Sequence, residues 1–293
     1  MTKIMDKKII EEIKKLFENV GQIKNCDYST VPTLGKYFKE ISDEIKSEDN
    51  FGDIFNSTAQ SNLRSWDNCR RVFHRAAYQR NPDSADMPTP PECKCNICGV
   101  DCNGMNCRIC NNSLALNLAF YLSSWGMYRS SFLKKYDHTV HIGAVKILME
   151  SKYLPLFDPL LWKNKPCLYK KLVKNVYERL FVYYALYASK KTRQNGNTYN
   201  VTDTLITKII LGVYGCMPSY DRYVKKAIYN IGGTNKITLA KNNLDLVMHE
   251  VVILAHIFYP LILHILKTKT SWDKCDLYTP MKILDMILFS LGK

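Results

Sequence analysis

Apolar residues recur at helical spacing along most of the chain. The pattern begins with an amphipathic helix whose buried stripe is Ile9, Ile10, Ile13, Leu16 and Phe17. It predicts further helices at about 34–45, 63–78, 113–124, 140–152, 168–189, 203–213, 219–230, 244–266 and 280–291. No alternating run is bounded by hairpin turns, and no internal repeat is found. The sequence therefore predicts an all-α fold.

Two of the C-terminal helices carry local signals of their own. Thr279 is a residue type that caps helices, and Pro280 after it would occupy the first turn, where no N–H is required. The apolar stretch 251–266 is interrupted by His256, Pro260 and His264, so it falls short of the ~20 apolar residues of a membrane-spanning helix. We expect a buried core helix that is kinked at Pro260, and no membrane partner.

A proline-rich segment divides the chain. Residues 81–91 contain Pro82, Pro88, Pro90 and Pro91, which exclude a helix there and indicate a linker. A cysteine-rich stretch follows, and the helical pattern resumes after it. The predicted organisation is an N-terminal helical region with the linker over 1–90, a metal-binding loop over 91–112 and a helical core over 113–293.

The balance of charge is strongly basic. The chain has 41 Lys and Arg against 27 Asp and Glu, a net charge of +14. Such a surface favours a polyanion, with nucleic acid ahead of an anionic membrane, although a lysine-rich coding bias gives the same excess. The N-terminus leads into an amphipathic helix without the apolar core of a secretory signal, so we expect a cytoplasmic protein. The sequence indicates no obligate protein partner.

The cysteines indicate a metal. The cluster consists of Cys93, Cys95, Cys98, Cys102, Cys107 and Cys110. Apolar side chains are almost absent from this segment, so tetrahedral zinc is the expected organiser, with Cys95-x-x-Cys98 and Cys107-x-x-Cys110 as its two knuckles. One tetrahedral site takes four thiolates, so Cys93 and Cys102 are surplus to it. Either one of them replaces a knuckle cysteine, or all six thiolates hold two metals. An iron–sulfur cluster and metal-free thiols are the alternatives. Four thiolates leave no open position, which makes the metal structural.

Two groups of residues are candidate contacts for nucleic acid. Between residues 163 and 193 the only acid is Glu178, and the expected phosphate contacts there are Lys170, Lys171, Lys174 and Arg193. The second group is Trp125, Tyr128 and Arg129, which follow a helix around Gly126 and form either a pocket for a base or a packed helix corner. His138 and His141 have no third ligand or nucleophile nearby, so we interpret them as surface or core residues.

The stretch from Thr202 to Val224 is the most informative. It predicts a helix, a glycine-containing turn, and then Pro218-Ser219-Tyr220-Asp221-Arg222 opening another helix. This arrangement resembles the heart of the helix-hairpin-helix DNA glycosylase superfamily, in which a short loop delivers an aspartate to the target sugar. The resemblance implies a helical glycosylase-like core with Asp221 as catalytic aspartate and Val224 as the apolar position after it.

Several features refine this resemblance. Residues 195–200 stand where the family has its Leu-Pro-Gly-Val-Gly hairpin. Lys208 lies nearer to Asp221 than the Schiff-base lysine of bifunctional members would, so a monofunctional enzyme is implied, with Lys208 and Arg222 as DNA contacts. The cysteine cluster precedes the aspartate, unlike the iron–sulfur motif of the endonuclease III branch. The chain also looks like divergent glycosylases that defend bacteria by excising hypermodified phage bases.

The chemistry of the residues is compatible with base excision. Cleavage of an N-glycosidic bond builds positive charge on the sugar, which one carboxylate can stabilise. The base must first leave the stack and enter a pocket, for which Trp125, Tyr128, Arg129 and Tyr220 are the candidates. Alternatively, Asp221 is only an acid that interacts with the N-terminus of a helix. The protein would then be a non-enzymatic nucleic-acid-binding protein or a structural protein.

Overall fold

The computed structural model describes part of the chain. The described residues are 11, 13–15, 28, 31, 59–79, 107–129, 131–192, 196–231, 244–273 and 278–293. Every regular element in these ranges is helical, and an isolated bridge between Thr192 and Thr198 is their only β pairing. The all-α prediction is confirmed for this part. The predicted helix at 34–45, and most of the one at 9–17, lie outside it.

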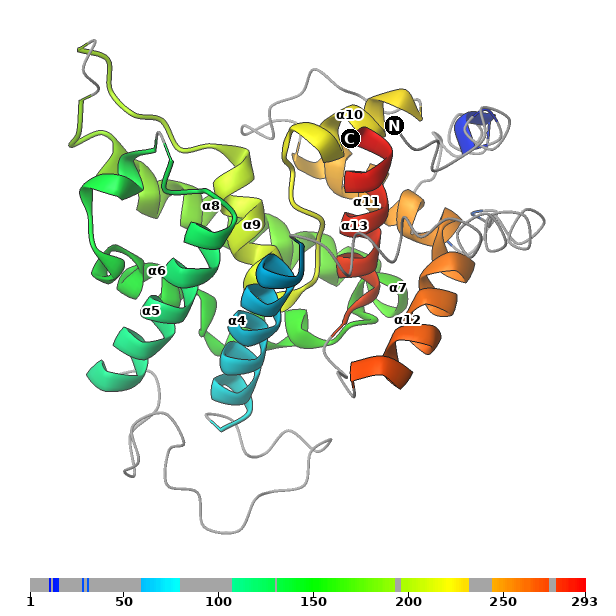
Figure 1. Ribbon diagram of the computed structural model, residues 1–293, viewed down its shortest axis with the longest axis horizontal. Helices are drawn as coiled ribbons and strands as arrows, with labels where there is room; N and C mark the ends of the chain where they lie inside the picture. The colour runs from blue at the N-terminus through cyan, green and yellow to red at the C-terminus, as the bar shows by residue number, and fades with distance from the viewer. Residues whose placement is uncertain are drawn as a thin grey trace. The chain divides into compact units, whose positions relative to one another are not determined.

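The α-helices are α4 (Ala59–Gln79), α5 (Arg108–Ser124), α6 (Ile142–Leu148), α7 (Leu161–Asn164), α8 (Pro166–Ala188), α9 (Asp203–Tyr214), α10 (Arg222–Asn230), α11 (Leu244–Ile257), α12 (Tyr259–Asp273) and α13 (Pro280–Gly292) (Figure 1). Three 3₁₀ helices accompany them: η3 (Phe132–Lys135), η4 (His138–His141) and η5 (Ser151–Phe157).

Of the eight predicted helices that lie in the described part, five are confirmed and three are corrected. The helix predicted at 140–152 is wrong as a single element, since η4, α6 and η5 share the region and η5 contains Pro155. The helix predicted from 219 begins at Arg222, because Asp221 is extended and caps it. The stretch 244–266 forms two helices bent by 63°, and Pro260 is the second residue of α12.

The chain folds as two compact units, which interleave along the sequence. The first unit consists of Met1–Gln60, Asp158–Lys174 and Gly215–Lys293, and the second of Ser61–Phe157 and Asn175–Tyr214. The three consecutive regions expected from the sequence stay a prediction, because most of residues 1–58 and all of residues 80–106 lie outside the described part.

The second unit is organised around α9. Every residue from Leu205 to Tyr214 is buried, in keeping with a helix that is apolar on almost all sides. The Trp66 Nε1–H of α4 donates to the carbonyl of Leu211 at 2.9 Å. Arg70, only 3% exposed, donates to the carbonyls of Val213 and Tyr214 at the end of α9. A buried guanidinium thereby satisfies carbonyls that the end of the helix leaves without partners.

The first unit is organised around α13. Residues Pro280 to Leu288 are all buried, and α10, α11 and α12 contact this helix (Figure 1). Thr279 caps α13 as predicted, because its side chain accepts the N–H of Lys282 at 3.1 Å. The helix that holds the core of this unit also carries two buried charges, Lys282 and Asp285.

Among the described residues, no single helix is long and apolar enough to cross a membrane. The bent pair of α11 and α12 meets the requirement of length and composition when the two helices are taken together.

Candidate functional site

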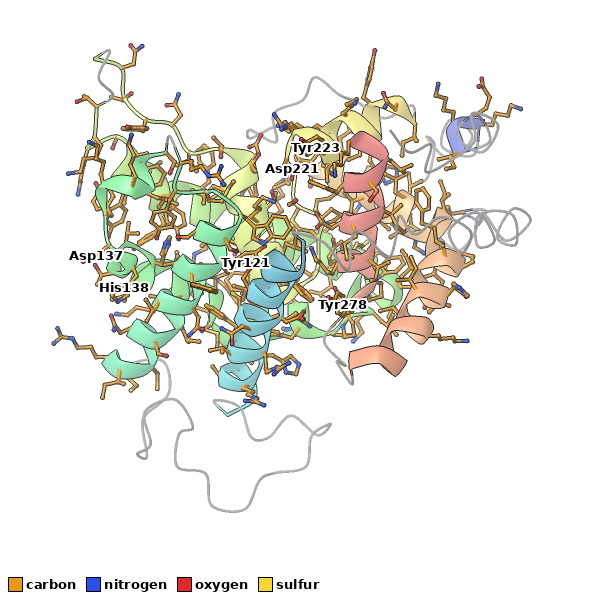
Figure 2. The ribbon with its side chains drawn as sticks, in the orientation of Figure 1. Tyr121, Asp137, His138, Asp221, Tyr223 and Tyr278 are labelled. Atoms are coloured by element: carbon orange, nitrogen blue, oxygen red, sulfur yellow. The ribbon has the colours of Figure 1, made fainter. Side chains whose placement is uncertain are left out.

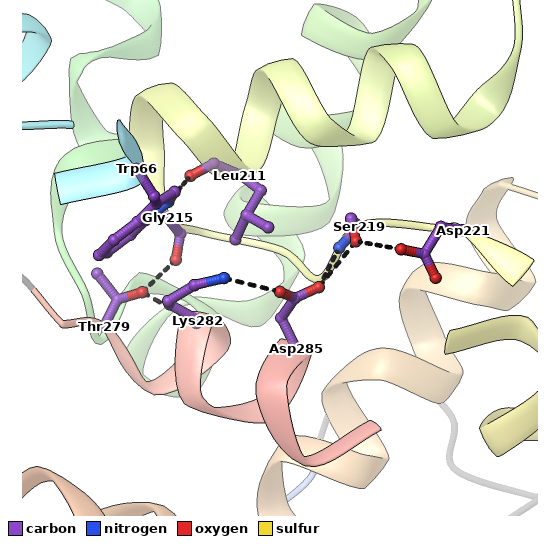
Figure 3. Close-up of polar contacts among 8 residues, drawn as sticks. All are labelled: Trp66, Leu211, Gly215, Ser219, Asp221, Thr279, Lys282 and Asp285. Carbon is purple, nitrogen blue, oxygen red and sulfur yellow. Dashed lines mark hydrogen bonds and ion pairs between the residues drawn. The ribbon is translucent and has the colours of Figure 1, made fainter. Parts of the chain in front are cut away.

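The loop between α9 and α10 carries Asp221. It begins at Gly215, whose φ of 63° lies in the left-handed region that favours glycine at the end of a helix. Three contacts from α13 hold the loop (Figure 3). Thr279 Oγ1 donates to the carbonyl of Gly215, while Asp285 Oδ1 accepts Ser219 N–H at 2.8 Å and Ser219 Oγ–H at 2.9 Å. Both ends of the loop are therefore fixed to one buried helix.

A buried ion pair supports these contacts. Lys282 Nζ lies 2.9 Å from Asp285 Oδ2, and the two side chains are only 1% and 7% exposed. The lysine balances the charge of a carboxylate whose other oxygen is used by Ser219. Since a buried charge without a partner is very costly, the pair and the loop depend on each other.

Asp221 itself is the N-cap of α10. Its Oδ1 accepts the N–H groups of Tyr223 at 3.0 Å and Val224 at 3.1 Å, and its φ and ψ of −89° and −178° are extended. Ser219 Oγ lies 3.4 Å from Oδ2. The carboxylate is half-buried at the start of α10, beside Tyr223 (Figure 2). Its role as a helix-terminal acid is confirmed, and its catalytic role stays a prediction.

The neighbours of Asp221 have partners of their own. The Arg222 guanidinium lies 4.6 Å from the centre of the Tyr223 ring and donates to the Tyr223 hydroxyl. Tyr220 is 1% exposed, and Lys225 Nζ lies 4.8 Å from the centre of its ring. Arg222 is thus the exposed member of this group, whereas the Tyr220 side chain forms part of the buried loop.

In the second unit, the C-terminus of α5 forms a sharp corner. Gly126 has a φ of 72°, the Gly126 N–H donates to Ser123 O, and the Met127 N–H donates to Leu122 O, a Schellman turn. The Arg129 guanidinium folds back over this turn, so that a Cβ on Gly126 would lie 3.2 Å from Arg129 Nε. The turn thereby places Trp125, Tyr128 and Arg129 on neighbouring positions at one end of α5.

Lys208 of α9 reaches this corner. Its side chain is almost fully buried, and its ammonium lies 4.4 Å from the centre of the Trp125 ring, a cation–π contact. Lys208 was predicted to contact DNA and Trp125 to line the base pocket. The structure brings these two residues together.

Tyr128 belongs to a hydrogen-bonded line. Its hydroxyl lies 2.8 Å from His141 Nε2, and His141 Nδ1 lies 2.6 Å from the Tyr184 hydroxyl. Burial lowers the pKa of His141 to about 3, so this histidine is neutral. His141 is therefore the core residue that the sequence allowed. His138 is half-buried beside the exposed Asp137 (Figure 2), and its Nε2 lies 3.0 Å from Asn112 Oδ1.

The predicted site residues fall into two groups. The first unit holds Asp221, Tyr220 and Arg222, together with Lys170, Lys171 and Lys174. The second unit holds Trp125, Tyr128, Arg129 and Lys208. Contacts join Trp125 to Lys208 in the second unit, whereas in the first unit Tyr220, Asp221 and Arg222 are consecutive and the three lysines lie on α8.

The predicted phosphate contacts on α8 differ in their surroundings. Lys170 Nζ lies 5.7 Å from the centre of the Tyr28 ring, and Lys174 forms an ion pair with Asp245 of α11. Lys171 is exposed and has no acidic partner among the residues that the structure describes. Lys171 is therefore the best placed of the three for a phosphate. Arg193 lies outside the described residues.

Two of the predicted metal ligands are described. Cys107 precedes α5, and its Sγ accepts the N–H of Cys110 at 3.4 Å. An N–H···S bond at a helix N-terminus stabilises a thiolate, so this Cys-x-x-Cys turn fits one knuckle of a zinc site. Cys93, Cys95, Cys98 and Cys102 lie outside the described residues. Within the described ranges no three His, Cys, Asp or Glu side chains gather as a metal site would require.

Sequence reasoning did not identify the residues that support these groups. Lys282 and Asp285 had one usable signal, since two opposite charges three positions apart interrupt an otherwise apolar helix. The contact between His141 and Tyr184 had no signal in the sequence, because the two residues are 43 positions apart. Comparison with known proteins adds no assignment: no protein family, curated protein or solved structure matches this chain.

Proposed function

We propose that the protein is a monofunctional DNA glycosylase in which Asp221 is the catalytic carboxylate. The observation that carries the proposal is the loop of Asp221, which starts at a glycine turn, ends at a helix cap and is held between them by the buried Lys282–Asp285 pair. Stabilisation of a developing sugar cation needs a negative charge that is already in position. A carboxylate on such a loop meets that requirement.

The two carboxylate oxygens of Asp221 have different roles in this proposal. Oδ1 accepts both cap hydrogen bonds, which fixes the orientation of the carboxylate. We assign Oδ2, which has a long contact of 3.4 Å with Ser219 Oγ, to the sugar or to the attacking water. The negative charge is shared by both oxygens, so the cap does not remove it from the reaction.

The remaining candidates take roles that their chemistry supports. Within the second unit, Trp125 is suited to stack on a base of bound nucleic acid, and Tyr128 and Arg129 are suited to hydrogen-bond with it. The exposed side chains of Lys171 and Arg222 are suited to phosphates. Structural zinc on Cys107, Cys110 and two further cysteines would organise the loop before α5. A hypermodified base of phage DNA is the substrate class that the resemblance implies.

A second candidate function is nucleic-acid binding without catalysis. The observation that favours it is the cap itself, because two backbone hydrogen bonds from α10 give Asp221 a complete structural role. The basic side chains would then bind DNA, and the buried ion pair would only stabilise the first unit.

The substitution Asp221→Asn separates these functions. Asparagine caps helices as well as aspartate does, and its amide can donate to Ser219 Oγ, whose own proton then goes to Asp285. If Asp221 is catalytic, the variant should release abasic sites orders of magnitude more slowly from the same modified DNA. Its DNA affinity should be unchanged, and its stability should fall by only about 0.3 to 1 kcal/mol.

Asp137→Asn is the matched control. Asp137 also caps a helix, since its Oδ1 accepts the N–H of Thr139 at 2.9 Å at the start of η4. This variant should keep full activity. If Asp221→Asn were fully active, Asp221 could not be the catalytic carboxylate, and DNA binding without catalysis would be the better explanation.

A further inference from the structure

Hydrogen bonds join Tyr128, His141 and Tyr184 in a line, and the burial of these residues determines which group donates and which accepts in each bond. His141 and Tyr184 are 0% exposed, whereas Tyr128 is half-buried at the corner after α5. The two hydrogen bonds, 2.8 Å and 2.6 Å long, use both ring nitrogens of His141. A neutral imidazole has one N–H and one acceptor nitrogen, so one tyrosine donates to the ring and the other accepts from it.

All three groups keep their neutral forms. Burial lowers the pKa of His141, raises the pKa of Tyr128 to about 12 and raises the pKa of Tyr184 well above its ordinary value. Two arrangements of protons then remain. Either Tyr184 donates to Nδ1 and Nε2–H donates to Tyr128, or Tyr128 donates to Nε2 and Nδ1–H donates to Tyr184.

The buried tyrosine decides between them. Among the described residues His141 is the only hydrogen-bond partner of the Tyr184 hydroxyl. In the second arrangement the Tyr184 proton would be buried without an acceptor, and that group would pay its full desolvation penalty. In the first arrangement every proton inside the line is used. The proton of the Tyr128 hydroxyl is then directed away from His141.

We infer that Tyr128 is fixed as a hydrogen-bond donor, and that the corner of Trp125, Tyr128, Arg129 and Lys208 binds an acceptor oxygen of nucleic acid. The exposed Arg129 guanidinium agrees with this assignment, because it donates hydrogen bonds and accepts none, and the Lys208 ammonium beside the Trp125 ring adds positive charge to the same corner. The ligand presents a base carbonyl or a phosphate oxygen to this corner. The inference rests on the proposed function for the nature of the ligand, but it does not require catalysis.

The direction of the line can be measured without any ligand. Long-range ¹H–¹⁵N spectra of the full-length protein, labelled on histidine, distinguish the two imidazole tautomers. We expect His141 to carry its proton on Nε2, with the signal lost in His141→Gln to assign it. A proton on Nδ1 would overturn the inference, whatever the protein does to DNA.

The ligand is tested by binding of two single-stranded oligonucleotides of equal length, one of thymidine and one of abasic sites. The variant Tyr128→Phe removes only the hydroxyl, and its affinity should fall about tenfold, the value of one hydrogen bond. Tyr136→Phe is the matched control, because its hydroxyl donates to the carbonyl of Tyr187 in the same unit. It should bind both probes as the wild type does.

The two probes separate the two sources of the acceptor. A loss for thymidine alone identifies a base carbonyl, and an equal loss for both identifies a phosphate; either result supports the inference. Unchanged affinity of Tyr128→Phe for both, or no binding of either probe by the wild type, would overturn it. Failure of the glycosylase proposal shows differently, as binding without abasic sites.

Discussion

Breaking the Lys282–Asp285 pair should strongly destabilise the first unit. In Lys282→Met the Asp285 carboxylate stays buried, with two hydrogen bonds from Ser219 but without the lysine that neutralises it. In Asp285→Asn the lysine loses its ion-pair partner, although an amide oxygen can still accept from Ser219. Each single change should cost about 3 to 5 kcal/mol of unfolding free energy, as removal of one partner of a buried pair does.

The double variant should be less damaged than the additive expectation. Lys282→Met with Asp285→Asn removes both charges and keeps the acceptor for Ser219. What remains is one buried amide N–H₂ without a partner, which costs about 1 to 3 kcal/mol. Two independent losses would add to about 6 to 10 kcal/mol. The difference between these values is the coupling between the two side chains.

Urea denaturation followed by circular dichroism measures these changes, from the midpoints and a common slope. The control pair is Lys174–Asp245 of the same unit, whose side chains are 36% and 67% exposed. The same substitutions there should each cost less than about 1 kcal/mol. Additive losses in the double variant, or single losses as small as those of the control pair, would refute the reasoning.

Three further predictions concern charge, metal and pH. Lys171→Gln should reduce the slope of log affinity for duplex DNA against log salt by about 0.9, and Lys174→Gln by less, because Asp245 already pairs with Lys174; equal slopes would contradict this. The purified protein should contain about one zinc per chain, and elemental analysis that finds neither zinc nor iron would refute the metal site. Acidification from pH 6.5 towards 3 should lower the unfolding free energy, because the unfolded chain binds a proton that folded His141, with its pKa of about 3, does not. The unfolding free energy is not reduced by this effect above about pH 6.5, and it falls by about 1.4 kcal/mol for each pH unit below that. The urea midpoint of His141→Gln should therefore fall less on acidification than that of the wild type.

The features that the sequence predicted well are local ones. The helix expected at 203–213 is observed as Asp203–Tyr214, and Thr279 caps α13 as its position before Pro280 indicated. Both depend on side chains and backbone groups within one or two helical turns. Local patterns of this kind survive in the fold because packing reinforces them.

Arg70 illustrates what such patterns leave out. It is one of four arginines, with Arg64, Arg71 and Arg75, on the helix predicted at 63–78, and the sequence does not distinguish it from the others. In the structure it is 3% exposed and donates to backbone carbonyls 143 and 144 positions further along the chain. A buried cation is tolerated when carbonyls at a helix end accept its hydrogen bonds, and no periodicity in the sequence reveals that arrangement.

The candidate site shows the same division between local and distant contacts. The position of Asp221 at the start of a helix could be predicted from the residues around it, and the cap confirms it. The partners that hold its loop, Lys282 and Asp285, come from a helix more than 60 positions away. The position of the candidate residue was thus easier to predict from the sequence than the residues that hold its loop in place.

The support beneath Asp221 exceeds what a helix cap requires. Asp137 caps η4 from an exposed position through contacts within its own three-residue turn. The loop of Asp221 is instead joined to a buried ion pair, a kind of contact that by itself adds little net stability over well-packed apolar side chains. What the pair provides is an acceptor for the backbone and the hydroxyl of Ser219, two residues before the carboxylate. Such an arrangement is expected where the position of a carboxylate matters more than the free energy of folding, and this makes Asp221→Asn, compared with Asp137→Asn, the most informative substitution in the chain.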